Sequence, residues 1–379
     1  MRATLRSWGA VAFLGVLPAA VLVALAVLVV SGGRHGSDFA TFWESGRHVL
    51  HGVSPYPRLQ SLPAVADRVT FSPFVYPPAA AFAMVPLSLL PFGAANVLFL
   101  LLGLGCVALT LQLLGVRDWR CYGTAFLSEP VFAAAGNGTI SLVLLLGVAA
   151  AWRYRATTVR LGMIVAALVA LKLFLWPLWV WLVWTRRFAA ASVSALTVGA
   201  VTLAGWALLG FAGFHDYPRL LGRLTRLVGP NSYSLYALER AAGASHGAAQ
   251  AGLVVAACFV LICVARARLR TDSASFAAAI GAALLLTPIL WPHYLVLLFV
   301  PIALARPALS GLWLLPLAFW LDGSTWSDGR AVRIVPVLVL AAAAVLLSLR
   351  DERAVVGHID VLARLRPDRG RERCVGSKA

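Results

Sequence analysis

The sequence predicts an all-α membrane protein that crosses the bilayer many times. Of its 379 residues, 61% are hydrophobic and only 12% are charged, whereas soluble domains carry about 25% charged residues. Apolar runs close to the membrane-spanning length of about 20 residues recur from one end of the chain to the other. Short arginine clusters separate these runs, as expected for loops at a membrane surface.

The arrangement of the basic residues explains the net charge of +17. In a soluble protein this charge would suggest nucleic acid as a partner, but here the arginines lie between apolar runs. That pattern marks the cytoplasmic loops of membrane proteins, so we expect a multi-pass protein of the cell membrane that contacts lipid and binds no nucleic acid. The clusters are Arg153/Arg155/Arg160, Arg186/Arg187, Arg266/Arg268/Arg270 and the tail from Arg350 onward.

The apolar stretch 8–30 is the first predicted span. It is longer than the core of a signal peptide, and no small-residue cleavage site follows it. With the N-terminus in the cytoplasm, this span delivers the polar segment 31–77 to the outer side. We therefore predict a membrane-embedded domain over 1–349, with outer loops at 31–77 and 213–247, and a basic cytoplasmic tail over 350–379.

The remaining apolar runs predict about twelve spans in total, some of them short or broken, with both chain ends inside. A short membrane-dipping segment is expected at 78–90. The other expected crossings are 93–114, 120–136, 139–152, 188–212, 248–265, 275–290, 295–305, 308–321 and 334–349. This arrangement gathers polar residues on the outer side, where they indicate one outward-facing site: Asp38, Tyr76, Asn137, Lys172, Asn231 and His293.

The segment between Arg160 and Arg187 predicts a broken pair of helices. Both ends are basic and belong in the cytoplasm, so a single span would leave one of them outside. An up-and-down pair of short helices solves this and places 172–177 at the turn. Each arm has about 12 residues, or roughly 18 Å of helix, which is less than the bilayer thickness of about 30 Å. The turn must then lie at depth beside a cavity, because lipid does not tolerate irregular backbone.

Residues 38–50 predict an amphipathic helix that lies at the membrane surface directly after the first span. Asp38 at its start allows two interpretations: it stabilises the first helical turn, or it acts as a general base at the boundary between lipid and water. Glu44 is the nearby competitor for the role of base. Its spacing of three residues from Arg47 favours a surface ion pair instead.

A series of motifs follows this helix along the chain. DFATFW, HGVSPY and FVYPPAAAFAMVPLSLLP come first, and GNGTISLVLLL, ALVALKLFLWPL, NSYSLYALE and LTPILWPHYLVLL come later. In this order and spacing, over about 8–350, they resemble glycosyltransferase family 87, the polyprenol-phosphate-mannose-dependent mannosyltransferases of actinobacteria, which have the GT-C fold. The family has an aspartate after its first span, then a G-x-x-PY turn and a YPP signature.

The resemblance implies an inverting glycosyltransferase that uses no nucleotide sugar. The donor is a polyprenyl-phosphate sugar, here mannose, and the acceptor is a glycolipid or cell-envelope glycan on the outer face, of the phosphatidylinositol mannoside, lipomannan or lipoarabinomannan type. Some relatives transfer arabinofuranose, so an arabinofuranosyltransferase is the alternative. A lipid or sugar transporter is a third possibility, which the lack of similar halves in the sequence disfavours.

The resemblance also implies roles for single residues. Asp38 aligns with the catalytic aspartate of the family. Lys172 and His293 are expected at the donor phosphate, although a lysine can also reach the membrane interface and a lone histidine is often structural. No CxxC or HExxH spacing occurs, so we expect neither a metal nor a cofactor. Further substrate contacts are expected from residues that otherwise suit turns or the aromatic belt, namely Tyr76, Asn137 and Asn231.

Overall fold

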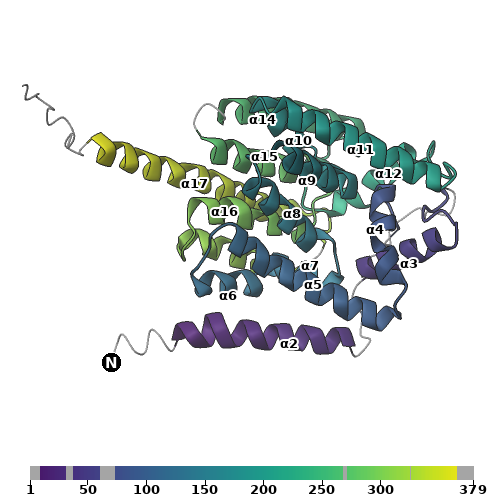
Figure 1. The fold of residues 1–379 in the computed structure, drawn as a ribbon, viewed down its shortest axis with the longest axis horizontal. Coiled ribbons are helices and arrows are strands. Elements are labelled where there is room, and N and C mark those ends of the chain that lie inside the picture. Colours follow the sequence, from purple (N-terminus) through teal and green to yellow (C-terminus); the bar gives the residue numbers. More distant parts are fainter. Residues whose placement is uncertain (1–8, 31–36, 60–72, 268–270, 325, 365–379) are drawn as a thin grey trace, which may run out of the picture.

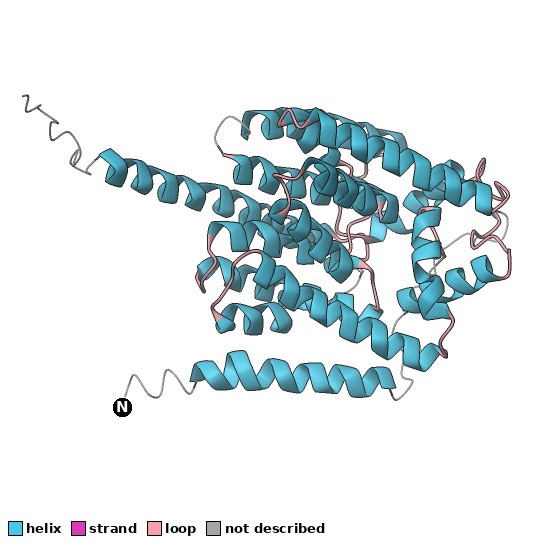
Figure 2. Ribbon diagram, in the orientation of Figure 1, coloured by secondary structure: helices cyan, strands magenta, loops and turns pink. Residues whose placement is uncertain are grey.

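The computed structural model describes residues 9–30, 37–59, 73–267, 271–324 and 326–364, and these consist of helices joined by loops, with no strand among them (Figures 1 and 2). The predicted all-α class is confirmed. The α-helices are α2 (Leu17–Val30), α3 (Ser37–Leu50), α4 (Pro78–Ser88), α5 (Phe92–Leu113), α6 (Trp119–Leu127), α7 (Glu129–Asn137), α8 (Ser141–Arg153), α9 (Thr158–Leu171), α10 (Pro177–Trp184), α11 (Phe188–Leu208), α12 (Tyr217–Val228), α13 (Leu235–Ala241), α14 (His246–Ala267), α15 (Asp272–Leu286), α16 (Phe299–Ala305) and α17 (Ala331–Arg364). Short π and 3-10 segments are η1 (Ala12–Val16), η3 (Leu173–Leu175), η4 (Gly229–Asn231), η5 (Pro292–Leu298) and η6 (Gly311–Leu321).

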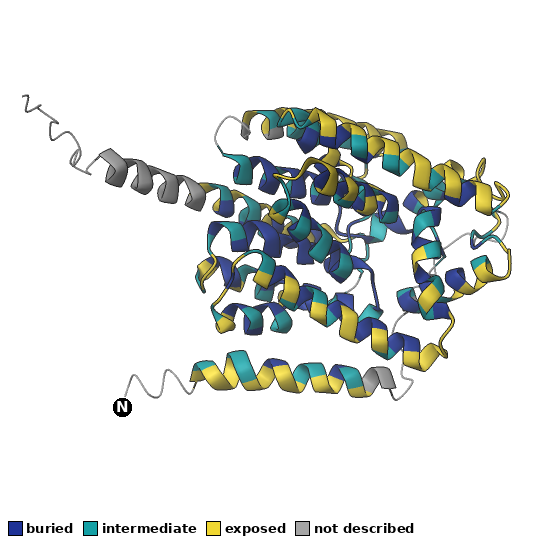
Figure 3. Cartoon of the chain, viewed as in Figure 1, coloured by how far each residue is buried: buried dark blue, intermediate teal, exposed yellow. Residues whose placement is uncertain are grey.

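Several helices are suited to a lipid environment. Five of them in the described part are long and apolar enough to cross a membrane, and shorter apolar helices of 10–17 residues accompany them. In the window His246–Cys263 only 6% of the residues are buried inside the molecule. Exposed residues lie along α2, α11 and α14 at the periphery, and buried residues fill the centre (Figure 3). The chain is therefore a membrane protein, while the count of about twelve spans stays a prediction.

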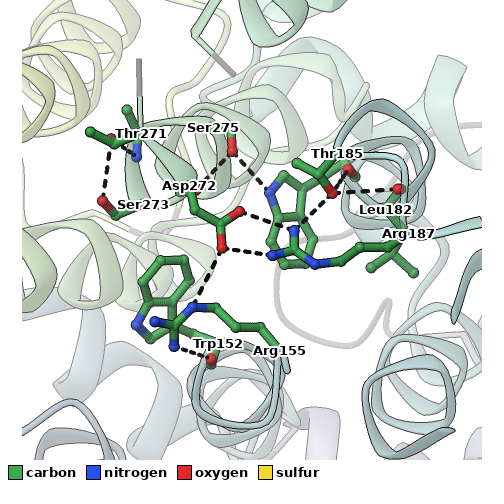
Figure 4. Close-up of polar contacts among 11 residues, drawn as sticks. Trp152, Arg155, Leu182, Thr185, Arg187, Thr271, Asp272, Ser273 and Ser275 are labelled. Atoms are coloured by element: carbon green, nitrogen blue, oxygen red, sulfur yellow. Dashed lines mark hydrogen bonds and ion pairs between the residues drawn. The ribbon is translucent and has the colours of Figure 1, made fainter. Parts of the chain in front are cut away.

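An ion-pair cluster ties several helix ends together. Asp272 begins α15, and its carboxylate binds the guanidinium of Arg187 at 2.7 Å and that of Arg155 at 3.4 Å (Figure 4). Arg155 precedes α9, and Arg187 follows α10. The segment between them therefore leaves this end of the molecule and comes back to it. The predicted up-and-down pair of helices is confirmed.

The turn of this hairpin lies at Lys172, as predicted. Helix α9 has 14 residues, which corresponds to roughly 21 Å of helix, short of the bilayer's thickness of about 30 Å. Lys172 then takes an extended conformation, with φ −153° and ψ 111°. A single 3-10 turn follows, and Pro177 opens α10, where a missing N–H costs nothing. Lys172 and Leu175 in the turn are buried, whereas Leu173 and Trp176 are exposed.

Two further short helices start or end at the same ion-pair layer. Helix α8 has 13 residues and ends at Arg153, and α15 has 15 residues and begins at Asp272. Their opposite ends lie at a depth similar to that of Lys172, because every residue of helix advances about 1.5 Å. Figure 1 shows α3, α4 and α12 at this deeper side of the bundle, opposite the C-terminal part of α17. The ends of α8, α9 and α15 that lie opposite the ion-pair layer therefore point toward the side of α3, α4 and α12.

Some predicted boundaries were wrong. The expected crossing 120–136 is two helices, because Pro130 has no N–H with which to continue α6 and the chain is extended at Ser128. The helix expected to end at 349 continues to Arg364, since residues 350–364 contain no proline that would break it. The loop 213–247 contains α12 and α13. Parts of the predicted loop 31–77 and tail 350–379 lie outside the described residues.

Candidate active site

A cavity of ≈ 1030 Å³ lies where the interrupted helices meet. Its lining includes the predicted site residues Asp38, Tyr76, Asn137, Lys172 and His293. These residues come from five separate segments of the chain, and only the tertiary arrangement brings them to one space. Asn231 is the exception: it is not part of the lining, and its backbone carbonyl accepts a hydrogen bond from the Ser327 N–H at 2.9 Å.

Helix α3 presents Asp38 to the cavity because its opposite face is fixed. The rings of Phe39 and Phe42 on this face are 0% exposed, and Phe42 packs on Tyr76 with 4.6 Å between ring centroids. A Cβ at Gly46 would lie 3.0 Å from the Met84 backbone, so α3 approaches α4 more closely than another residue allows. The predicted amphipathic helix 38–50 is confirmed, and its polar face turns to the cavity.

Lys172 is buried, with a relative exposure of 7%, so it does not reach out to an interface. Its ammonium nitrogen lies 4.0 Å from the ring centroid of Tyr294 and 4.9 Å from that of Tyr76, and it donates to the Tyr76 hydroxyl at 3.4 Å. It also interacts electrostatically with Asp38. Aromatic faces stabilise a cation without neutralising it, so this lysine keeps its attraction for an anion.

His293 is 4% exposed, and neither of its ring nitrogens has a hydrogen-bond partner in the described part of the chain. Buried polar groups are nearly always hydrogen-bonded. The ring lies on the cavity, at an edge-to-face distance of 4.8 Å from Tyr294, and interacts electrostatically with Lys172. An imidazole in this position can bind a ligand that enters the cavity.

Tyr76 is held by main-chain contacts that the sequence alone did not reveal. Its carbonyl accepts from the Tyr56 hydroxyl at 2.8 Å, and the neighbouring Val75 carbonyl accepts from the Tyr217 hydroxyl at 3.0 Å. Burial raises the pKa of Tyr56, which keeps its hydroxyl a donor. Tyr56 of the HGVSPY turn thus supports the site, and its place in the G-x-x-PY motif of the family resemblance was the available signal.

Asn137 occupies the C-terminal end of α7, where Gly138 turns the chain with a left-handed φ of 63°. Glycine adopts this conformation without steric cost, and it commonly ends a helix. The turn predicted at 136–138 is confirmed, and Asn137 lines the cavity just before it.

Glu44 also lines the cavity, which contradicts its predicted ion pair with Arg47. The Arg47 guanidinium lies instead over the ring of Trp43, 4.9 Å from the centroid. A tryptophan face is the best aromatic partner for a cation, so the arginine turns away from the acid. Sequence spacing could not show whether Arg47 contacts Trp43 or Glu44, because these residues precede it by four and three positions and both lie about one helical turn away.

The rest of the lining is largely apolar. Helix α12 turns its leucine face to the cavity, and its arginines Arg219 and Arg226 are exposed on the opposite face. The cavity thus has a polar side at α3 and Lys172 and a greasy side at α12 and the hairpin turn. The apolar lining residues include Leu173, Phe174, Trp176, Leu221, Leu224, Val228, Leu286 and Ile289.

Fold and cavity together define a helical membrane protein with a pocket among broken helices that is polar on one side and apolar on the other. The model of glycosyltransferase family 87 matches residues 74–292, more than half of the chain, and the chain belongs to this family. It is therefore a membrane glycosyltransferase. The match includes Tyr76, Asn137 and Lys172, whereas Asp38 precedes it and His293 follows it directly. No curated protein and no solved structure matches the chain.

Proposed function

We propose that the protein transfers a mannosyl residue from polyprenyl-phosphate-mannose to a glycolipid or cell-envelope glycan, with inversion at the anomeric carbon. One observation carries this proposal: a carboxylate, a buried ammonium group and an unpartnered imidazole line the same cavity, whose other side is apolar. Such a transfer needs a base for the acceptor, cationic or donor groups for the leaving phosphate, and a greasy surface for the polyprenyl chain.

The chemistry follows from these positions. The Asp38 carboxylate removes the proton of an acceptor hydroxyl. The resulting oxygen attacks the anomeric carbon from the face opposite the phosphate, and the bond between that carbon and the phosphate oxygen breaks. Polyprenyl phosphate leaves with the bonding electrons, and Lys172 and His293 stabilise its charge. Asp38 ends the step protonated.

The sugar and the lipid occupy different sides of the cavity in this proposal. Tyr76 and Asn137 contact the donor sugar. Asn231 is outside the lining, so it can contact the substrate only if its turn rearranges. The polyprenyl chain lies along α12 and the hairpin turn, where burial of each CH₂ group contributes about 0.8 kcal/mol. This division explains why so polar a reaction centre lies beside so many leucines.

The basic clusters support an extracytoplasmic active site. Arg155 and Arg187 lie in the ion-pair layer, at the end of the hairpin opposite Lys172. Cytoplasmic loops of membrane proteins are enriched in arginine and lysine. We therefore assign the ion-pair layer to the cytoplasmic side and the cavity to the outer side of the cell membrane.

A transfer assay tests the proposal. Membranes that contain the protein are supplied with polyprenyl-phosphate-[³H]mannose, and labelled glycolipid is extracted and separated. We expect a mannosylated product that is missing from membranes without the protein. Labelling only from polyprenyl-phosphate-[³H]arabinofuranose would identify an arabinofuranosyltransferase, and uptake of donor without any covalent product would indicate a transporter.

A further inference from the structure

Helix α3 brings a second carboxylate to the cavity, and the proposed transfer does not use it. Glu44 lines the cavity together with Asp38 and Thr41. Spacings of three residues place these side chains along one side of the helix. Asp38 and Glu44 are the acids in the lining, and they lie on the same wall.

The surroundings of Glu44 leave its carboxylate available. In the part of the chain that the structure describes, Glu44 has no hydrogen bond and no ion pair. Asp118, Asp216 and Asp272, by contrast, each bind an arginine. The nearby Arg47 is engaged with Trp43, so no described side chain occupies the Glu44 oxygens.

Charge determines which substrate Glu44 can meet. A carboxylate repels a phosphate, so it disfavours the donor's phosphate on its own side of the cavity. Lys172 and His293 offer that phosphate a better position. Asp38 must reach the acceptor hydroxyl, so the wall that carries Asp38 and Glu44 is the acceptor side. Carboxylate oxygens accept hydrogen bonds from hydroxyl groups and gain more from them than neutral acceptors do.

We propose that Glu44 binds the hydroxyl groups of a polyhydroxylated acceptor headgroup and thereby positions the reacting hydroxyl at Asp38. The ligand is a sugar or polyol ring with neighbouring hydroxyls, which two oxygens of one carboxylate can bind together. This inference rests on the proposed function only in taking the Asp38 wall as the acceptor side. Glu44 itself exchanges no proton in the reaction.

Direct binding tests this assignment without any transfer. The probe is tritiated octyl α-mannoside, bound to the purified protein in lipid nanodiscs with no donor present and corrected with empty nanodiscs. We expect Glu44→Gln and Glu44→Ala to weaken binding roughly 10-fold or more, as for a lost hydrogen bond to a charged group. Asp216→Asn, a change at an exposed acid outside the cavity, should bind like the wild type. Wild-type affinity in Glu44→Gln, or a wild type that does not bind the mannoside, overturns the proposal.

Transfer kinetics provide a second readout. Glu44→Gln should raise the acceptor KM while the donor KM and kcat stay near their wild-type values. A large loss of kcat with unchanged acceptor binding would make Glu44 the base and overturn its role as a binding residue. If the mannoside binds in a Glu44-dependent manner but no sugar is transferred, the proposed function fails and the headgroup site stands.

Discussion

Among the described residues, the ammonium group of Lys172 is surrounded by aromatic rings rather than by a carboxylate at contact distance. A lysine in direct contact with an acid would have its charge largely cancelled, and an incoming phosphate would first have to break that pair. The Tyr76 hydroxyl accepts a hydrogen bond from only one of the three N–H groups of the Lys172 ammonium. The remaining N–H donors are available to the leaving group, beside the imidazole of His293, whose ring nitrogens have no partner among the described residues.

The first prediction concerns the base. Asp38→Asn keeps the size of the side chain and removes its basicity, so we expect kcat to fall by about 10²–10⁴-fold, the usual range for general base catalysis. The donor KM should change little. Initial rates of mannosyl transfer measure this, with size-exclusion elution as the control for folding. Near-normal turnover would remove Asp38 from the mechanism.

The second prediction concerns the leaving phosphate. Lys172→Ala should raise the donor KM by roughly 10–100-fold, in line with the loss of a charge-assisted hydrogen bond, and leave the acceptor KM unchanged. Lys172→Arg retains the charge and should recover part of the donor affinity. Equal losses for donor and acceptor would instead mean that the lysine only supports the fold.

At the scale of helices, the close approach of α3 to α4 positions the proposed base. The third prediction is that Gly46→Ala impairs both stability and activity, because the added Cβ would lie 2.9 Å from Ser88 Oγ and 3.0 Å from the Met84 backbone. Overpacking of this kind costs about 1–3 kcal/mol, and a small shift of α3 should lower kcat about 10-fold or more. Thermal unfolding and initial rates measure the two effects.

Gly93→Ala is the matched control for this change. Gly93 lies in the first turn of α5, and nothing lies within 4 Å of the position that its Cβ would take. We expect normal activity and equal or higher stability, since alanine favours a helix. Loss of activity in both variants would show that the close α3–α4 contact has no special role.

The ion pairs of Asp272 with Arg155 and Arg187 also act at the scale of helices, because they join the ends of several of them. The fourth prediction is that Asp272→Ala lowers stability by roughly 1–3 kcal/mol, because it leaves the partly buried Arg187 and Arg155 without their shared acid. Asp216→Ala, which removes the exposed pair with Arg219, should change stability by less than about 1 kcal/mol. Thermal melts of both variants in one detergent compare them, and equal melting temperatures would contradict a role for the layer.

At the scale of the whole molecule, the two ends of α9 face opposite sides of the membrane in our proposal. The fifth prediction uses a background in which the five cysteines are replaced. In intact cells a membrane-impermeant thiol reagent should label Lys172→Cys from outside, through the cavity. Arg160→Cys, at the other end of the same helix, should react only after the membrane is opened. The reverse pattern would invert the topology.

Local chemistry made much of this architecture predictable. Arginines bracket the 160–187 segment, and lipid excludes irregular backbone, so a hairpin with its turn at Lys172 followed from the chain alone. The amphipathic helix 38–50 followed from its pattern of polar and apolar residues. The division of 120–136 into two helices was missed, although Pro130 marks it, because hydropathy averages over such a break.

The sequence by itself determined the class of protein, the hairpin and most of the residues that face the site, since hydropathy and charge act on each segment separately. Tertiary structure decided which of those residues meet. Asp38, Tyr76, Asn137, Lys172 and His293 line one cavity, whereas Asn231 lies beyond it. Glu44 faces the same space, and Arg47 turns to Trp43 instead of pairing with it. The physical reason is that side-chain direction depends on how helices pack, and no spacing along a single helix contains that information.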